Sequence, residues 1–346
     1  MAKPEDLQYA GPEPVEALAS QLLLRLGRDG VRAQAQDLVI GSSALELLVL
    51  ALDAHIGAGR RHLVAVEEPG YSRAFDAIER AGYRLVGIEL DDTGAVPGSL
   101  QAALEAGAMA VLLTPRAHNP TGVSWDAKRR AALADVLAAS PEVLAIEDDH
   151  FAELAIARPG SLFADPRFAE RVVYIRSFGK SIAPDLRLAV AVARPRLRAG
   201  IAEAESLTSG WRSRLTQRAL ASALADPELD AALDVARRAY ADRRGLVRRA
   251  ITAALAPAGA GAAGDDGLNI WVQLPFGADA VEVLERAADL GVLAAPGEPY
   301  FIRPGRADVL RLTIAALDTE RAAELGAALG RAAANAMRAG TATVCV

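Results

Sequence analysis

The feature that most constrains the fold is an alternation, between residues 37 and 193, of short apolar runs with longer segments of helical periodicity. The segments between the runs, such as Ala44–Ala54 and Lys128–Ala138, repeat apolar residues at helical spacing. Strands that are apolar throughout are covered on both faces, which predicts an α/β fold with a mostly parallel, seven-stranded sheet. The predicted strands are Asp37–Ile40, His62–Val66, Arg84–Leu90, Ala108–Leu113, Val143–Ile146, Val172–Ile175 and Leu186–Ala193.

The rest of the chain has a different rhythm. Residues 195–255 have a helical pattern almost throughout, broken near Asp226-Pro227, and this stretch could bridge two domains. Beyond it, a smaller α+β unit is predicted from the segments Gly267–Leu274, Ala278–Leu290, Val309–Ala315 and Thr319–Arg338. We therefore expect an N-terminal segment (1–36), a large domain (37–225), and a linking helix with a small C-terminal domain (226–346).

Charge, cysteine content and hydropathy exclude several classes of function. The net charge of −6 argues against a protein that grips nucleic acid. The one cysteine, Cys345, rules out an internal disulfide framework. No apolar run approaches the ~20 residues of a membrane span, and residues 1–10 lack the apolar core of a signal peptide. We expect a soluble, cytoplasmic protein without nucleic-acid or membrane partners.

Polar residues directly follow the predicted strands. Ligands of open α/β sheets bind beyond the carboxyl ends of the strands, so one site could gather all of these residues. They are Gly41-Ser42-Ser43, Glu68-Pro69-Gly70-Tyr71, Asn119-Pro120-Thr121-Gly122, Asp148 and the segment from Ser177 to Lys180.

Lys180 follows a strand and is flanked by small residues. If burial and neighbouring cations lower the pKa of its amine, it can form an imine with an aldehyde. Ser177 and Arg187 would then offer a hydroxyl and a forked guanidinium to a phosphate. The alternative is a solvated lysine after a strand, which its short motif alone does not exclude.

Two further positions have both a functional and a structural interpretation. Asp148 ends a strand, where its carboxylate could pair with a protonated ring nitrogen, bind a metal or cap a helix. Ser42 and Ser43, followed by Ala44, lead from a strand into a helix. Free backbone N–H groups and the helix dipole make such a junction an anion site, although the serines could equally serve as a plain N-cap.

The segment Thr114–Gly122 (TPRAHNPTG) resembles the "TP…NPTG" signature of the class I/II aminotransferases, the aspartate-aminotransferase superfamily of fold type I. The serine turn, the Glu-Pro-Gly-Tyr turn, the Glu-Asp-Asp strand, Ser-x-x-Lys and a late Leu-Arg-Leu follow the order of that family. The resemblance covers about residues 9–338. It is nearest to the aminotransferase-like domain of MocR-type (GntR-family) regulators, without their DNA-binding domain.

The resemblance implies a pyridoxal 5′-phosphate (PLP) cofactor, held as a Schiff base on Lys180, which would also shuttle the substrate's α-proton. Asp148 would pair with the ring nitrogen, Asn119 with the ring hydroxyl, and Tyr71 would stack on the ring. The phosphate would be held by Ser42, Ser43, Ala44, Ser177 and Arg187, and by Tyr9 of the neighbouring subunit in a homodimer with shared active sites. Arg311 would bind the substrate carboxylate, beside Asn119.

Departures from the family pattern leave some roles open. Where the family usually has a tyrosine after the strand aspartate, this chain has His150 and Phe151, so His150 either replaces that donor or is catalytically silent. Arg73 either binds a second acidic group of the substrate or is a solvated helix residue. The resemblance favours transfer of an amino group between an amino acid and a 2-oxo acid. The alternatives are decarboxylation, elimination or oxidation with PLP, or a non-catalytic PLP-binding sensor.

Overall fold

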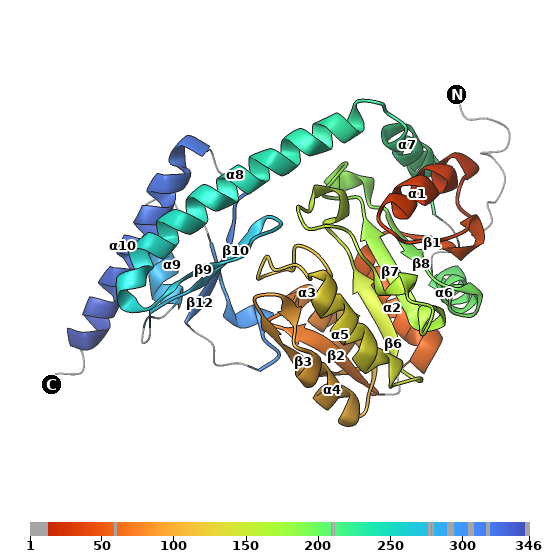
Figure 1. Cartoon of the computed structure of the whole chain (residues 1–346), viewed down its shortest axis with the longest axis horizontal. Helices are drawn as coiled ribbons and strands as arrows, with labels where there is room; N and C mark the ends of the chain where they lie inside the picture. The colour runs from red at the N-terminus through yellow and green to blue at the C-terminus, as the bar shows by residue number, and fades with distance from the viewer. Residues whose placement is uncertain are drawn as a thin grey trace.

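The structure is a computed structural model that describes residues 13–58, 61–208, 210, 212–275, 278, 280–288, 294–303, 308–315 and 319–342. The chain forms two β-sheets of unequal size, and one long helix runs from the larger to the smaller (Figure 1). Among the described helices, none combines the length and the hydropathy needed to cross a membrane.

The larger sheet has eight strands in the order β1-β8-β7-β6-β5-β2-β3-β4. The strands from β7 to β3 in this order are mutually parallel, whereas β8 runs antiparallel to both of its neighbours. It follows that β1 points the same way as the parallel strands. Their bounds are β1 Leu38–Gly41, β2 Leu63–Glu68, β3 Arg84–Asp91, β4 Gly94–Ala95, β5 Ala108–Leu113, β6 Leu144–Asp148, β7 Val172–Ser177 and β8 Ala189–Val192.

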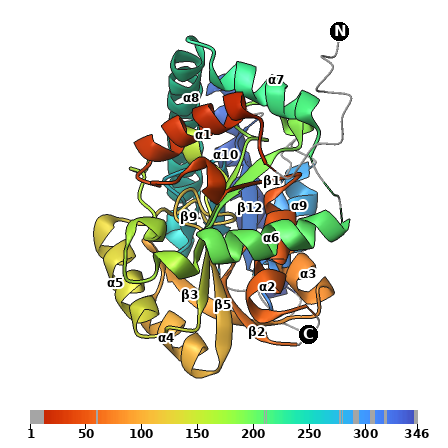
Figure 2. The ribbon, with the colours of Figure 1, turned by 90° about the vertical axis from the view of Figure 1, so that its right-hand side faces the viewer.

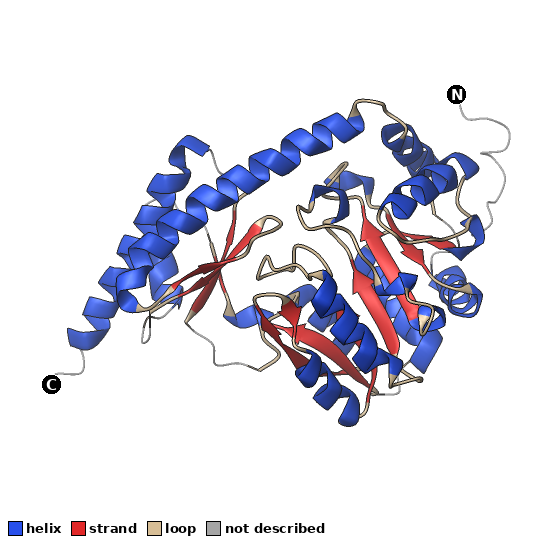
Figure 3. Ribbon diagram, in the orientation of Figure 1, coloured by secondary structure: helices blue, strands red, loops and turns tan. Residues whose placement is uncertain are grey.

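Helices cover both faces of this sheet (Figures 2 and 3). One face packs on α1 (Glu16–Arg28), α4 (Pro97–Glu105), α5 (Ala127–Ala138) and α7 (Arg214–Leu224). The other packs on α2 (Ala44–Ile56), α3 (Ser72–Arg80) and α6 (Pro195–Thr208). The central strands β5 and β6 are buried almost throughout because apolar helices lie on both sides of them.

The long helix α8 (Leu229–Leu255) leads to a four-stranded antiparallel sheet in the order β11-β12-β10-β9. This second sheet has a separate hydrophobic core, which is formed by residues of α8, β10, β12 and α10, among them Ile251, Ile270 and Leu310. The bounds in this part of the chain are β9 Gly261–Ala263, β10 Asn269–Gln273, α9 Ala280–Ala288, β11 Ala295–Pro296, β12 Val309–Thr313 and α10 Thr319–Ala342.

All seven predicted strands of the larger sheet form, and the predicted helical break at Asp226-Pro227 lies between α7 and α8. Three short strands, β4, β9 and β11, were not predicted because two or three residues carry too little periodicity. The stretch 195–255 also ends one helix at Thr208 and begins the next at Arg214. The domain boundaries at 36/37 and 225/226 remain predictions.

Candidate active site

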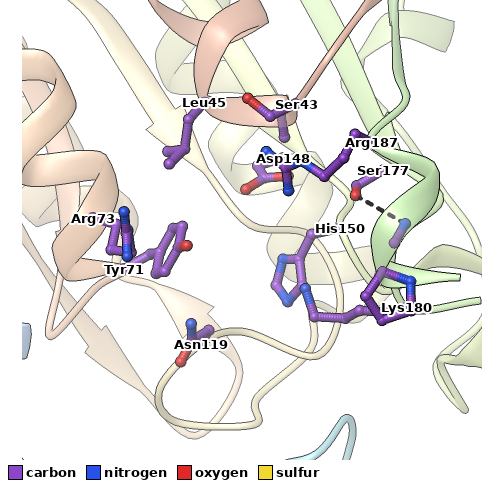
Figure 4. A pocket seen from close by; sticks show the side chains of 13 residues that line it. Ser43, Leu45, Tyr71, Arg73, Asn119, Asp148, His150, Ser177, Lys180 and Arg187 are labelled. Atoms are coloured by element: carbon purple, nitrogen blue, oxygen red, sulfur yellow. Dashed lines mark hydrogen bonds between the residues drawn. The ribbon is translucent and has the colours of Figure 1, made fainter.

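A cavity of about 470 Å³ lies where the carboxyl ends of the parallel strands meet (Figure 4). Because β8 begins at this same edge, the loop before it also contributes to the wall. The predicted convergence is therefore present in the structure. The lining residues are Ser43, Ala44, Leu45, Tyr71, Arg73, Asn119, Asp148, His150, Ser177, Gly179, Lys180, Pro184 and Arg187.

At one end of the cavity is the N-terminus of α2. Ser43 is its N-cap, and its hydroxyl accepts a hydrogen bond from the Glu46 N–H at 3.2 Å. The N–H groups of Ala44 and Leu45 belong to the first helical turn and have no intrahelical acceptor, so they can bind an anion in the cavity.

Ser42 does not line this cavity. Its N–H and its hydroxyl both donate to Glu46 Oε2, each at 2.8 Å, and the other oxygen of Glu46 accepts from Arg212. Ser42 is thus hydrogen-bonded to the first turn of α2 and not directed to the cavity, whereas Ser43 lines the cavity. One of the two alternatives for these serines, the N-cap, is present at Ser43. The cap leaves the neighbouring N–H groups of Ala44 and Leu45 available to an anion.

Asp148 reaches the cavity from the end of β6. Its Oδ1 atom is buried and, within the described ranges, has no hydrogen-bond partner. Burial raises the pKa of its carboxyl to about 6, against the opposing effect of Lys180. A buried carboxylate without a donor is costly, so this atom is suited to a ligand that brings a donor or a positive charge.

The acidic neighbours of Asp148 point elsewhere. Glu147 is fully buried and accepts hydrogen bonds from Ser161 Oγ and the Leu162 N–H. Asp149 pairs with the buried Arg116 and accepts from the Tyr174 hydroxyl, which holds the pKa of its carboxyl below the usual value. The three acids therefore have three separate environments. The described residues contain no group of three or more potential metal ligands.

Lys180 follows β7 and its side chain is open to the cavity. The surrounding protein desolvates its ammonium and lowers its pKa, while Asp148 opposes that shift. Ser177 also lines the cavity, and its Oγ accepts from the Gly179 N–H at 3.4 Å. Arg187 has a left-handed backbone with φ of 50°, which is uncommon for a residue with a side chain and occurs often at functional sites.

Tyr71, Arg73 and His150 also line the cavity. Tyr71 is the residue before α3, and Figure 4 shows its ring beside Arg73. Burial, and next the negative charge of Asp148, raise the pKa of the Tyr71 hydroxyl. Burial and the positive charge of Lys180 lower the pKa of His150 well below its usual value, so His150 is neutral near pH 7.

Like Ser42, one further described residue of the predicted site does not line the cavity. Arg311, on β12, lies behind Asn119, with Nη1 3.4 Å from Asn119 Oδ1 and its guanidinium 5.2 Å from the centre of the Tyr300 ring. Its Nε is buried without a partner in the described chain, which leaves it a donor to offer. Tyr9 lies outside the described residues.

A buried pair that the sequence did not suggest lies deeper in the sheet. Glu67 Oε2 is 3.4 Å from His118 Nε2 and accepts from the Thr114 N–H. Burial raises the pKa of Glu67 to about 8 and lowers that of His118 to about 3, so burial favours the neutral form of both groups. The sequence signal that could have indicated this pair is Glu67, a carboxylate at an inward-facing position of the largely apolar strand β2.

The sequence comparisons explain this arrangement. A family profile described as aminotransferase class I and II matches residues 2–329. The chain belongs to this family. Two of its relatives are the vitamin B6 salvage pathway transcriptional repressor PtsJ of Salmonella typhimurium and the 2-aminoadipate transaminase of Thermus thermophilus. The first is 34% identical over 86% of this chain and 67% of its own length. The second is 29% identical over 94% and 81%.

The fold agrees with this family. The α-aminoadipate aminotransferase LysN from Thermus thermophilus, complexed with N-(5′-phosphopyridoxyl)-L-leucine, superposes with a TM-score of 0.84 at 26% identity, over 96% of this chain and 85% of that one. The kynurenine aminotransferase of Pyrococcus horikoshii gives a TM-score of 0.84 at 26% identity, over 95% and 83%. A third relative, the HTH-type transcriptional regulator TauR of Rhodobacter capsulatus, is 31% identical, and the chain spans 58% of its length.

Family and fold identify a fold type I, PLP-dependent aminotransferase. The residues of the cavity fit PLP. The unpartnered Oδ1 of Asp148 suits a protonated ring nitrogen, and the free N–H groups at the start of α2 suit a phosphate. Lys180, its pKa lowered, suits an aldehyde.

Proposed function

We propose that the chain transfers an amino group between an amino acid and a 2-oxo acid, with Lys180 as the residue that carries PLP. The observation that supports this most is a lysine of lowered pKa in the same cavity as a carboxylate oxygen, Asp148 Oδ1, that is buried and has no donor in the described structure. Each group alone has a structural explanation. Together they match the two ends of a pyridine aldehyde, because the carboxylate suits the ring nitrogen and the lysine suits the aldehyde.

PLP, when bound, supplies an electron sink for the bonds at the substrate's α-carbon. Asp148 holds the proton on the ring nitrogen that makes this sink effective. Ser43, Ser177, Arg187 and the N–H groups at the start of α2 bind the phosphate. The Lys180 amine would take the proton from the substrate's α-carbon and return it two atoms further along, to the former aldehyde carbon of the cofactor.

Substrate orientation is assigned to Arg311. A forked guanidinium binds a carboxylate with two parallel hydrogen bonds, which a lysine cannot reproduce. Arg311 lies on the second sheet and Lys180 in the turn after β7 of the first, so a substrate held by both would draw the two parts together and exclude water. Arg73 also lines the cavity, where it can bind an acidic substrate side chain.

The proposal includes a homodimer, in which Tyr9 of one subunit contacts the phosphate of the other. Closed two-fold dimers are the commonest oligomers, and the resemblance to the family supports a shared site. We further propose the division into segments 1–36, 37–225 and 226–346, since the two sheets have separate hydrophobic cores.

A second candidate is a PLP-bearing sensor, because PtsJ and TauR are named as transcriptional regulators. Turnover separates the two functions. The PLP-loaded protein is mixed with a large excess of each of several amino acids and a 2-oxo acid acceptor, and the products are identified by mass. Many equivalents of new amino acid per protein support an aminotransferase. A spectral change without product supports a sensor, and a decarboxylated or eliminated product supports another PLP reaction.

A further inference from the structure

The amide of Asn119 is held from outside the cavity by the second sheet. Its Oδ1 accepts a hydrogen bond from Asn269 Nδ2 at 3.2 Å and lies 3.4 Å from Arg311 Nη1. A guanidinium has only donors, so the atom of Asn119 that faces Arg311 must be the oxygen. The amide nitrogen is consequently turned toward the cavity, as Figure 4 shows.

Asn269 is itself oriented by its neighbours. Its Oδ1 accepts from the hydroxyl of Thr313, the residue directly opposite it on β12, at 3.4 Å. The following residues Ile270 and Val272 alternate into the core of the small sheet, and this places Asn269 on the other face. With its oxygen toward Thr313, Asn269 presents its N–H groups to Asn119.

The main chain fixes this contact. The carbonyl oxygen of Gly122, in the same turn as Asn119, accepts from the N–H groups of Asp265 and Asp266 at 3.0 and 2.9 Å. Gly122 has φ of +71°, and a Cβ atom there would lie 2.8 Å from the Asn269 carbonyl oxygen. The segment that leads into β10 therefore packs directly on the turn that carries Asn119.

We infer that Asn269 is a positioning residue, which holds the Asn119 amide with its N–H groups toward the ring hydroxyl of PLP. The inference rests on the proposed role of Asn119. At 3.4 Å the bond from Arg311 is long, so Asn269 is the nearer of the two donors. Without it, only the longer contact from Arg311 holds the Asn119 oxygen, so the amide donates to the cavity with a less firmly fixed orientation.

The consequence is measurable in the cofactor's titration. A donor to the ring oxygen stabilises negative charge there, and that charge is greater when the Schiff-base nitrogen has lost its proton. The donor therefore lowers the pKa of the Schiff base. Loss of Asn269 should raise it by roughly 0.5–1 pH unit, where one unit is a tenfold change in proton affinity.

The test uses the PLP-loaded protein and follows the Schiff-base absorption band against pH in Asn269→Leu. Asn269→Ala is the second variant, in case the larger side chain disturbs folding. Gln273→Leu is the matched control, because it removes an amide from the same face of β10, where it binds Asp308 instead of Asn119. We expect the pKa to rise in both Asn269 variants and to stay at the wild-type value in the control.

A double-substitution cycle tests whether the effect passes through Asn119. Asn119→Ala alone should raise the pKa, and adding Asn269→Leu should raise it no further. An unchanged pKa in both Asn269 variants, or a full additional rise in the Asn119→Ala background, overturns the inference. If Asn119→Ala itself leaves the pKa unchanged, the proposed role of Asn119 is wrong and the inference fails with it.

Discussion

Replacing Asp148 by asparagine should make the PLP-free protein more stable at neutral pH, although it should impair catalysis. Burial raises the pKa of the Asp148 carboxyl from 3.8 to about 6. At about 1.4 kcal/mol for each of roughly two pH units, ionising this carboxyl in the folded protein costs about 3 kcal/mol. Asparagine has the same shape and no charge. Because Asp148 is only half-buried, we expect a gain of about 2–3 kcal/mol in the free energy of unfolding.

The sign of the pH dependence follows from proton linkage. A carboxyl with a raised pKa keeps its proton in the folded chain at a pH where the unfolded chain has lost it, so unfolding releases a proton. The cost in the wild type is therefore absent below about pH 4, grows between about pH 4 and 6, and is constant above that range. The stability difference between Asp148→Asn and wild type should follow the same curve.

Urea unfolding of both PLP-free proteins between about pH 4 and 8 measures this difference, because the other buried acids are the same in both and cancel. Saturating PLP should reverse the order of stability, since its ring nitrogen supplies the charge that Asp148 needs. The reasoning is refuted if Asp148→Asn is less stable than wild type at pH 8 without PLP. A stability difference that does not change with pH would show that the carboxylate already has a partner.

Three further predictions address substrate, assembly and fold. Arg311→Lys should weaken amino-acid binding by roughly 2–3 kcal/mol while amines without a carboxylate are unaffected; equal affinity in steady-state kinetics of the two proteins would contradict this. In mixed dimers of Tyr9→Phe and Lys180→Ala chains, one site combines an intact Lys180 with an intact Tyr9 from the other subunit, and that site should regain phosphate affinity. A monomer by light scattering would exclude active sites shared between subunits. Gly122→Ala should cost about 2–4 kcal/mol by urea unfolding, because its Cβ meets backbone atoms at a positive φ. Gly98→Ala, with open space around it, should cost nothing.

Sequence reasoning was most successful where side-chain periodicity and chemistry coincide. The seven longer strands of the first sheet were predictable because most of them are short, largely apolar runs. The residues after them converge because parallel strands end at one edge of the sheet. Asp148 and Lys180 were recognisable from their places after β6 and β7. Their separate environments were not, because burial depends on residues from distant parts of the chain.

Two side-chain contacts at the site could not be predicted. Ser42 and Ser43 are neighbours of the same type, and the structure shows that Glu46 accepts hydrogen bonds from Ser42 whereas Ser43 lines the cavity. The pairing of Asn119 with Asn269 joins residues 150 positions apart. The second of these contacts depends on how the second sheet sits on the first, and local periodicity carries no information about that.

The most direct test of the account is to identify the residue that carries PLP. The chain has three lysines, Lys3, Lys128 and Lys180, so the alternatives are few. The PLP-loaded protein is reduced with borohydride, digested, and the pyridoxyl-labelled peptide is identified by mass. We predict the label on Lys180, and loss of the Schiff-base absorption in a folded Lys180→Ala protein. A label on Lys3 or Lys128, or an unchanged absorption band in Lys180→Ala, would contradict the proposed site.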